Sequence, residues 1–281
     1  MAQLCDQLGR FGIWRSAYQM TAELAAEIER AGFGAMWLGG SPDGDLVQVE
    51  ELLAATSTLM VGTSIVNMWK DEAHTVARSF ARVQARYPGR FVLGVGAGHR
   101  EATQEYARPY ESLAAYVGTL LGDGVPRDAL VLAALGPKVL RLAAERTAGA
   151  VPYLVTPEHT RQARDILGPD PLLAPEHKVV LDTDLRRARA LGRARVRKPY
   201  LGMVNYTSNL RRLGWTEDDL SDGGSDALID ALVAHGSAEQ VASQLRMHLD
   251  AGADHVVVQL LTEQDADPAP GYRQLAQALK L

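Results

Sequence analysis

The chain has 281 residues, of which 47% are hydrophobic and 22% are charged, as is typical of a folded globular protein. Its formal net charge of −5 argues against nucleic acid or an anionic membrane surface as its main partner. The single cysteine, Cys5, excludes a disulfide framework and a cysteine-rich metal site, and no segment has the pattern of a membrane span or a secretory signal. We therefore expect a cytoplasmic protein that acts on a small molecule.

A unit made of an amphipathic helix, a glycine and an apolar strand recurs along the chain. The glycines suit the left-handed conformation in which helices end, because they carry no Cβ. The strands are nearly continuously apolar, as expected of a parallel sheet that is covered on both faces. Eight strands are expected, around Phe11–Trp14, Ala35–Leu38, Leu59–Val66, Phe91–Val95, Leu130–Ala134, Val151–Leu154, Lys178–Leu181 and His255–Leu260. Helices are expected at Thr21–Ala31, Asp45–Thr56, Asp71–Tyr87, Arg108–Leu121, Pro137–Thr147, Pro157–Leu167 and Ala238–Ala251.

Eight such units in a chain of this length predict an α/β fold, a closed (β/α)8 TIM barrel, in a single domain of residues 1–281. A doubly wound sheet with a second domain fits less well. The seventh strand has the weakest pattern, because Pro175 lies close before it. Residues 183–236 separate this strand from the last unit, and we expect them to form a helical insertion at the mouth of the barrel.

The stretch "GRFVLGVGAGH" places three glycines, Gly94, Gly96 and Gly98, at alternate positions. A dinucleotide fingerprint needs a different spacing directly after the first strand, and three units precede this one. In a barrel, Gly94 and Gly96 would leave room near the C-terminal face for a ligand or another backbone, with His99 on the adjoining loop. The alternative is a tight turn that needs small residues, with His99 in solvent.

Two stretches of the chain are distinctive together: "YPGRFVLGVGAGH" after "VGTSIVNMW", and "LGPKVLRLAAERTAGAVPYLVTPEH". They resemble one known family, the luciferase-like flavin and deazaflavin oxidoreductases. The first resembles the third and fourth strands of that family, and the second resembles its phosphate-binding turn and the following unit. The stretch from "LGMVNYTSNLRRLG" to "LDAGADHVVVQLL" resembles a subgroup that uses coenzyme F420. The resemblance covers essentially the whole chain and implies F420, or alternatively FMN, as the cofactor.

At the third strand, the resemblance implies a non-proline cis peptide between Ser64 and Ile65, behind the middle of the cofactor ring. The alternative is an ordinary strand end. Asn67 could bond the edge of the ring or could simply structure its loop. Gly96 is expected to lie beside the cofactor.

The resemblance also assigns Leu135, Gly136, Pro137 and Lys138 to the phosphate turn. The residues themselves support this assignment, since free amides at a helix start attract an anion. Tyr153, or alternatively Leu154, is expected near the cofactor. Thr156 is expected to cap the next helix.

A basic run in the insertion, "DLRRARALGRARVRKPY", could contact the polyglutamate tail of the deazaflavin. The alternative is a solvated helix face that pairs with nearby acids.

The acid–base residues of the sugar-phosphate dehydrogenases in this superfamily are absent. Gly40 stands where they have a histidine after the second strand, and His99 stands where they have a glutamate. Their substrate is therefore not implied, and His99 is the remaining candidate for the catalytic acid or base. Trp14, Trp37, Trp69 and Tyr206 are either walls of the substrate pocket or core residues.

The sequence thus predicts hydride transfer between C5 of the deazaflavin and a small organic substrate. Two alternatives remain: an FMN-dependent monooxygenase, and a barrel that binds the cofactor without catalysis. No metal site is expected, since the histidines lack the spacing of ligands. Relatives commonly form pairs, so a homodimer is possible.

Overall fold

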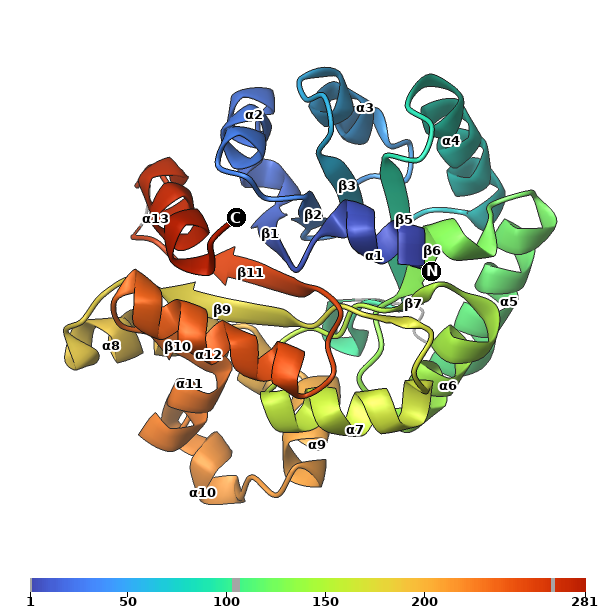
Figure 1. The fold of residues 1–281 in the computed structure, drawn as a ribbon. Helices are drawn as coiled ribbons and strands as arrows, with labels where there is room; N and C mark the ends of the chain where they lie inside the picture. The colour runs from blue at the N-terminus through green and yellow to red at the C-terminus, as the bar shows by residue number, and fades with distance from the viewer. Residues whose placement is uncertain (1, 103–106, 264–265) are drawn as a thin grey trace.

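A computed structural model describes residues 2–102, 107–263 and 266–281. Eleven strands in this described part form one parallel sheet that curls into a barrel, with helices around it (Figure 1). The predicted (β/α)8 architecture is confirmed. Its strands are β1 (Phe11–Ser16), β2 (Ala35–Gly39), β3 (Met60–Ser64), β4 (Val66–Asn67), β5 (Phe91–Gly96), β6 (Leu130–Leu132), β7 (Gly149–Ala150), β8 (Leu172–Leu173), β9 (Glu176–Val180), β10 (Val233–His235) and β11 (Val256–Leu260).

The helices that cover the barrel begin and end within two residues of the predicted positions. They are α2 (Ala22–Arg30), α3 (Val47–Ala54), α4 (Ala73–Arg86), α5 (Pro109–Gly122), α6 (Pro137–Arg146), α7 (Pro157–Leu167) and α12 (Ala238–Asp250), to which α13 (Ala269–Leu279) is added. Thr156 caps α7 as expected, since its hydroxyl accepts the amide of His159. In the described ranges, no helix combines the length and the apolarity that crossing a bilayer requires.

The barrel closes through β8 and β9, which are two halves of one extended segment. The amide of Ala174, between them, donates to Ala150 in β7, while the carbonyl of Pro175 accepts the amide of Val257 in β11. Pro175 thus needs no N–H toward its neighbours, and a proline is tolerated in this strand. The seventh strand therefore starts well before the expected Lys178–Leu181.

The sixth strand is also shorter and earlier than expected. It comprises only Gly149 and Ala150, and the expected Val151–Leu154 lies beyond its end. A Cβ on Gly149 would collide with the backbone of Leu172, so β7 can approach β8 this closely only at a glycine. The apolar residues that follow continue toward the mouth of the barrel without strand pairing.

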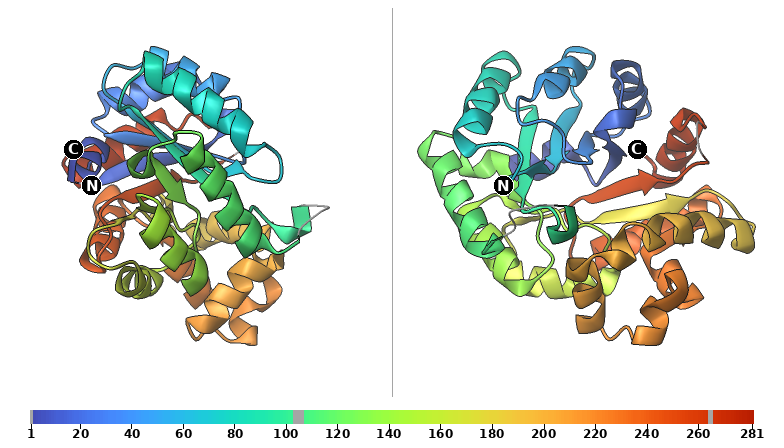
Figure 2. Two further views of the ribbon diagram at one scale, coloured as in Figure 1. Left: turned by 90° about the vertical axis from the view of Figure 1, so that its right-hand side faces the viewer. Right: turned by 180° about the vertical axis from the view of Figure 1, so that it is seen from behind.

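The stretch 183–236 forms helices and one strand. Figure 2 shows these helices together on one side of the molecule. The strand, β10, pairs with β9 on the edge opposite to β11. This stretch therefore extends the barrel wall at its mouth. The helices are α8 (Leu185–Arg197), α9 (Val204–Arg212), α10 (Glu217–Leu220) and α11 (Asp226–Leu232).

The opposite end of the barrel is filled by the N-terminal helix α1 (Ala2–Leu8). Leu4 and Leu8 pack in the lumen with Trp37, Met60 and Val257. Trp37, one of the proposed pocket walls, is therefore a core residue at the floor of the barrel.

Gly94 allows close approach of two strands. Its amide donates to the Thr63 hydroxyl, and that hydroxyl donates back to the Gly94 carbonyl, both at 2.9 Å. A Cβ at residue 94 would collide with the carbonyl oxygen of Thr63. The room that Gly94 provides is thus taken by the backbone of β3.

The Gly94→Ala variant is expected to be less stable by about 2–3 kcal/mol, the cost of overpacking a core. Thr63 contributes a backbone oxygen to the collision, and this oxygen cannot rotate away. Urea unfolding measures the loss. As the matched control, Gly122→Ala at the end of α5 adds a methyl with no atom within 4 Å and should cost nothing. Equal losses for both variants would contradict this account.

His255 is held as a neutral imidazole. Its Nε2 accepts the indole N–H of Trp37 at 3.1 Å, and its Nδ1 donates to the carbonyl of Gly9 at 2.8 Å. Burial lowers the pKa of His255 to about 4. Protonation would turn Nε2 into a donor facing another donor.

The free energy of unfolding should therefore fall as the pH drops below about 6.5, the ordinary pKa of histidine. Below this pH the unfolded chain binds a proton at His255, whereas the native state binds it only near its own pKa of about 4. The free energy of unfolding therefore decreases as the pH falls from about 6.5 to about 4. Between pH 7 and pH 5 this residue should contribute a loss of about 2 kcal/mol. Urea unfolding of His255→Met should show a pH-dependent loss smaller by that amount. If the pH-dependent loss of stability is the same in His255→Met as in the unmodified protein, His255 is not its source.

Candidate functional site

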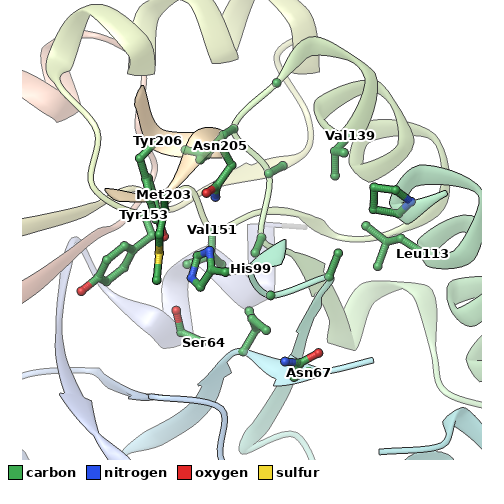
Figure 3. Close-up of a pocket in the computed structure, with 18 of the residues that line it drawn as sticks. Ser64, Asn67, His99, Leu113, Val139, Val151, Tyr153, Met203, Asn205 and Tyr206 are labelled. Carbon is green, nitrogen blue, oxygen red and sulfur yellow. The ribbon is translucent and has the colours of Figure 1, made fainter. Parts of the chain in front are cut away.

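A cavity of about 580 Å³ opens at the C-terminal ends of the strands (Figure 3). This volume lies within the range of roughly 300–1,000 Å³ that small-molecule sites occupy. The cavity brings together most of the residues expected from the sequence, while Gly96 and Pro137 do not line it. Those that line it are Ser64, Ile65, Asn67, His99, Leu135, Gly136, Lys138 and Tyr153.

The end of β3 forms one wall of the cavity. The peptide between Ser64 and Ile65 is cis, as the resemblance implied. The side chain of Asn67 accepts the amide of Trp69 at 3.0 Å, which is the loop-structuring role. Its amide group lies so close to Gly98 that a Cβ at residue 98 would collide with it. Gly98 also has a φ of +59°, which favours glycine.

Gly96 serves packing beside the cavity. A Cβ at this position would lie 3.0 Å from that of Ala133 and 3.2 Å from Ile65, and both of these residues line the cavity. Gly96 thus sets how closely β5 approaches the cavity wall.

The turn Leu135–Lys138, at the start of α6, is a candidate anion cradle. Gly136 is the N-cap and offers no side chain to accept the first amides of the helix. The amides at Lys138 and Val139 therefore remain available to an anion, and the positive end of the helix dipole favours one. The residues present fit the phosphate of a flavin-type cofactor.

Two further residues support this cradle, and the sequence did not reveal them. A side chain at residue 136 would lie 3.8 Å from Nη2 of Arg212 in α9, so a guanidinium stands beside the turn. On the other side, Nε2 of the buried His159 donates to the carbonyl of Leu135 at 2.9 Å. Burial lowers the pKa of His159, so it is a neutral donor that fixes the turn.

Three arginines of the basic run in α8 pair with acids. Arg187 pairs with Asp182, and Arg189 and Arg193 both pair with Asp226. These three arginines have the structural role that the sequence left open. Arg212, which lies outside the run, carries the guanidinium nearest to the cradle.

His99 lies in the middle of the cavity wall, next to the ring of Tyr206 at a centroid distance of 5.3 Å (Figure 3). Burial lowers the pKa of its imidazole, while Asn205 and the carboxylate of Glu101 oppose this shift in part. Among the described residues, Nδ1 of His99 and Oδ1 of Asn205 are both buried without a well-formed hydrogen bond. A neutral imidazole with unused bonding capacity can accept a proton from a bound molecule.

Gly39 and Gly40, at the end of the second strand, each suit their surroundings as glycines. The indole of Trp14 lies against Gly39, where any side chain would collide with the ring. Gly40, which follows, has a φ of +77°. The ring of Trp14 lines the cavity and occupies the space that a side chain at residue 39 would need.

Aromatic residues from two distant segments form the remaining wall. Tyr153 contacts Trp14 at a centroid distance of 5.4 Å and Tyr200 at 5.3 Å, and Tyr200 meets Tyr206 edge to face at 5.2 Å. Tyr200 belongs to a short helical turn (Tyr200–Gly202) before α9. The sequence suggested Trp14 and Tyr206 as walls but missed Tyr200, Met203 and Asn205, since nothing local distinguishes them.

A buried ion pair lies behind this wall. Nζ of Lys178 is 3.1 Å from the carboxylate of Glu176, and both side chains are fully buried. The ammonium stands 3.9 Å from the centre of the Tyr153 ring and 4.9 Å from that of Tyr200. Glu176 also accepts the amide of Leu154, so the pair ties β9 to the wall.

Residues 9–121 match the family model of the luciferase-like monooxygenases. The fold is similar to that of an F420-dependent secondary alcohol dehydrogenase in complex with an F420–acetone adduct, with a TM-score of 0.76, 16% identity, and 96% of this chain and 98% of that one covered. It is also similar to the F420-dependent tetrahydromethanopterin reductase from Methanopyrus kandleri, with a TM-score of 0.68, 16% identity, and coverage of 96% and 98%.

A third similar structure is the oxygenating constituent of 3,6-diketocamphane monooxygenase from Pseudomonas putida in complex with FMN. Its TM-score is 0.65 at 17% identity, with 96% of this chain and 97% of that one covered. No protein of curated function matches the sequence. Identities this low establish the fold alone. The sequence pattern of the luciferase-like monooxygenases is thus present in residues 9–121, and nearly the whole chain has a barrel fold similar to that of these structures.

Proposed function

We propose that the protein is an F420-dependent oxidoreductase that transfers a hydride between the deazaflavin and a small organic substrate in this cavity. The observation that carries the proposal is the arrangement of the cavity. An anion cradle lies at the start of α6, and a neutral histidine stands within an aromatic wall. Two similar structures are F420-dependent enzymes by name, which favours the deazaflavin over FMN.

Each part of the site has a proposed task. The amides after Gly136, with Lys138 and Arg212, bind the cofactor phosphate, and the end of β3 supports the cofactor ring. The bound deazaflavin would supply hydride transfer at its C5. His99 accepts or returns the proton of the substrate oxygen, and the aromatic wall keeps water away from it.

Titration of the protein with F420 and with FMN, followed by cofactor fluorescence, tests the proposal. We expect F420 to bind more tightly than FMN. Lys138→Gln and Arg212→Gln should each weaken F420 binding about fivefold, the effect of one partly exposed charge. Arg273→Gln, which removes a surface arginine paired with Glu27 on the barrel exterior, is the matched control and should leave binding unchanged.

Two other results would replace the proposal. Tighter binding of FMN together with oxygen consumption would indicate a flavin monooxygenase. FMN is the cofactor in the diketocamphane monooxygenase structure. Tight F420 binding without turnover of any carbonyl or alcohol would indicate a binding protein.

A further inference from the structure

The charges of the cavity are confined to one end. Among the described residues that line it, Lys138 is the one with a permanent charge, and it belongs to the anion cradle. No described aspartate, glutamate or arginine lines the cavity. His99 is neutral near pH 7, because burial lowers its pKa. The part of the cavity around His99 therefore offers no counter-charge to an ionic ligand.

The wall around His99 is aromatic and thioether surface. It is built by Trp14, Tyr153, Tyr200 and Tyr206. Figure 3 shows Met203 beside Tyr153 and Tyr206. Such surfaces bind through apolar burial and ring contacts. They provide area for a hydrocarbon skeleton.

The charges just outside the cavity also disfavour anions. The ammonium of Lys178 lies behind the Tyr153 ring and is neutralised by Glu176, so it is not free to pair with an anion. The carboxylate of Glu101, held by the amide of Val204 at 3.0 Å, adds a negative charge near His99 and opposes an anion there.

Three buried polar atoms of this wall lack a well-formed hydrogen bond within the described part of the chain: Nδ1 of His99, Oδ1 of Asn205 and the indole Nε1 of Trp14. Figure 3 shows the Asn205 side chain pointing toward His99. We propose that this part of the cavity takes an uncharged, largely apolar organic substrate, with one carbonyl or hydroxyl group beside His99 and Asn205. The reaction rests on the proposed function, whereas the binding preference does not.

Three aryl methyl ketones, one neutral, one anionic and one cationic, test the preference: acetophenone, 4-carboxyacetophenone and 4-acetylphenyltrimethylammonium. Their affinities are measured by calorimetry on the protein without cofactor and again on the protein loaded with whichever cofactor it binds. Acetophenone should bind at least about tenfold more tightly than either ion, since an ion loses hydration without gaining a partner.

A charge placed on the wall should change the order of affinities. Met203→Lys should strengthen binding of 4-carboxyacetophenone about tenfold and leave that of the trimethylammonium probe weak. Met247→Lys, on an exposed methionine of α12 outside the cavity, is the control and should change neither.

Equal affinities, a preference for an ion, or no binding of any probe would overturn this inference, as would equal effects of the two lysine variants. Failure of both cofactors to bind would instead overturn the proposed function. The probe series on the cofactor-free protein would still decide the substrate preference in that case.

Discussion

The His99→Asn variant is expected to lose turnover about a hundredfold to ten-thousandfold, the usual contribution of a general acid or base. Asparagine keeps hydrogen-bonding capacity at this position but cannot take up a proton. Binding of the cofactor should remain unchanged, because the anion cradle lies at the start of α6 rather than at His99. Steady-state kinetics should therefore show the loss in kcat with little change in cofactor affinity.

The pH profile gives the sign of the effect. Burial lowers the pKa of His99, so the imidazole is neutral at pH 7, and oxidation of an alcohol should slow only as the pH falls through a value below about 6.5. Asn205→Ala removes a group that favours the protonated imidazole, so it should move this acidic limb to still lower pH.

His74→Asn is the matched control for His99→Asn. His74 lies on the surface and pairs with Asp123, away from the cavity. Full activity of His99→Asn, or an equal loss of activity in His74→Asn, would show that His99 takes no part in the reaction.

The Glu176→Gln variant is expected to lose about 3–5 kcal/mol of stability, the cost of leaving a buried charge unpaired. The ammonium of Lys178 would be left with only the faces of Tyr153 and Tyr200 for compensation. Since burial lowers the pKa of Lys178, this loss should shrink as the pH rises. Urea unfolding at pH 7 measures the loss. Lys178→Met should also destabilise the protein, but this loss should shrink as the pH falls, because burial already raises the pKa of Glu176 and the carboxyl can take a proton.

The double variant Glu176→Gln with Lys178→Met separates a broken pair from lost packing. It leaves no buried charge, so it should recover most of the stability that either single variant loses. Additive losses in the double variant would mean that the two residues act independently, and that the ion pair does not hold the wall of the cavity.

Much of the fold followed from local patterns. The helices α2 to α7 and α12 were expected nearly at their observed bounds, because helical periodicity, N-caps such as Thr156 and the glycines after the helices are local signals. The seventh strand was misplaced for a related reason. Pro175 weakens the local pattern, and only its position between β7 and β11 makes the missing N–H unimportant.

Some residues of the candidate site could be predicted from local sequence, and others could not. The cradle at Gly136 could be foreseen, because a strand followed by glycine and proline at a helix start is a local anion-binding pattern. Arg212 could not, since it reaches the cradle from α9, more than seventy residues later in the chain. The glycines before His99 signalled close approach, but the approaching group at Gly94 is the backbone of β3.

The sequence by itself determined the barrel, its helices and the loop that carries His99, because each depends on periodicity or on capping between near neighbours. Only the tertiary structure decided what surrounds His99. The wall of Tyr153, Tyr200 and Tyr206 and the buried pair of Glu176 and Lys178 exist because the stretch after β9 folds back over the barrel mouth. Contacts between segments so far apart produce no periodic pattern in the sequence. The chemical character of the cavity around His99 is therefore set only when these segments pack together.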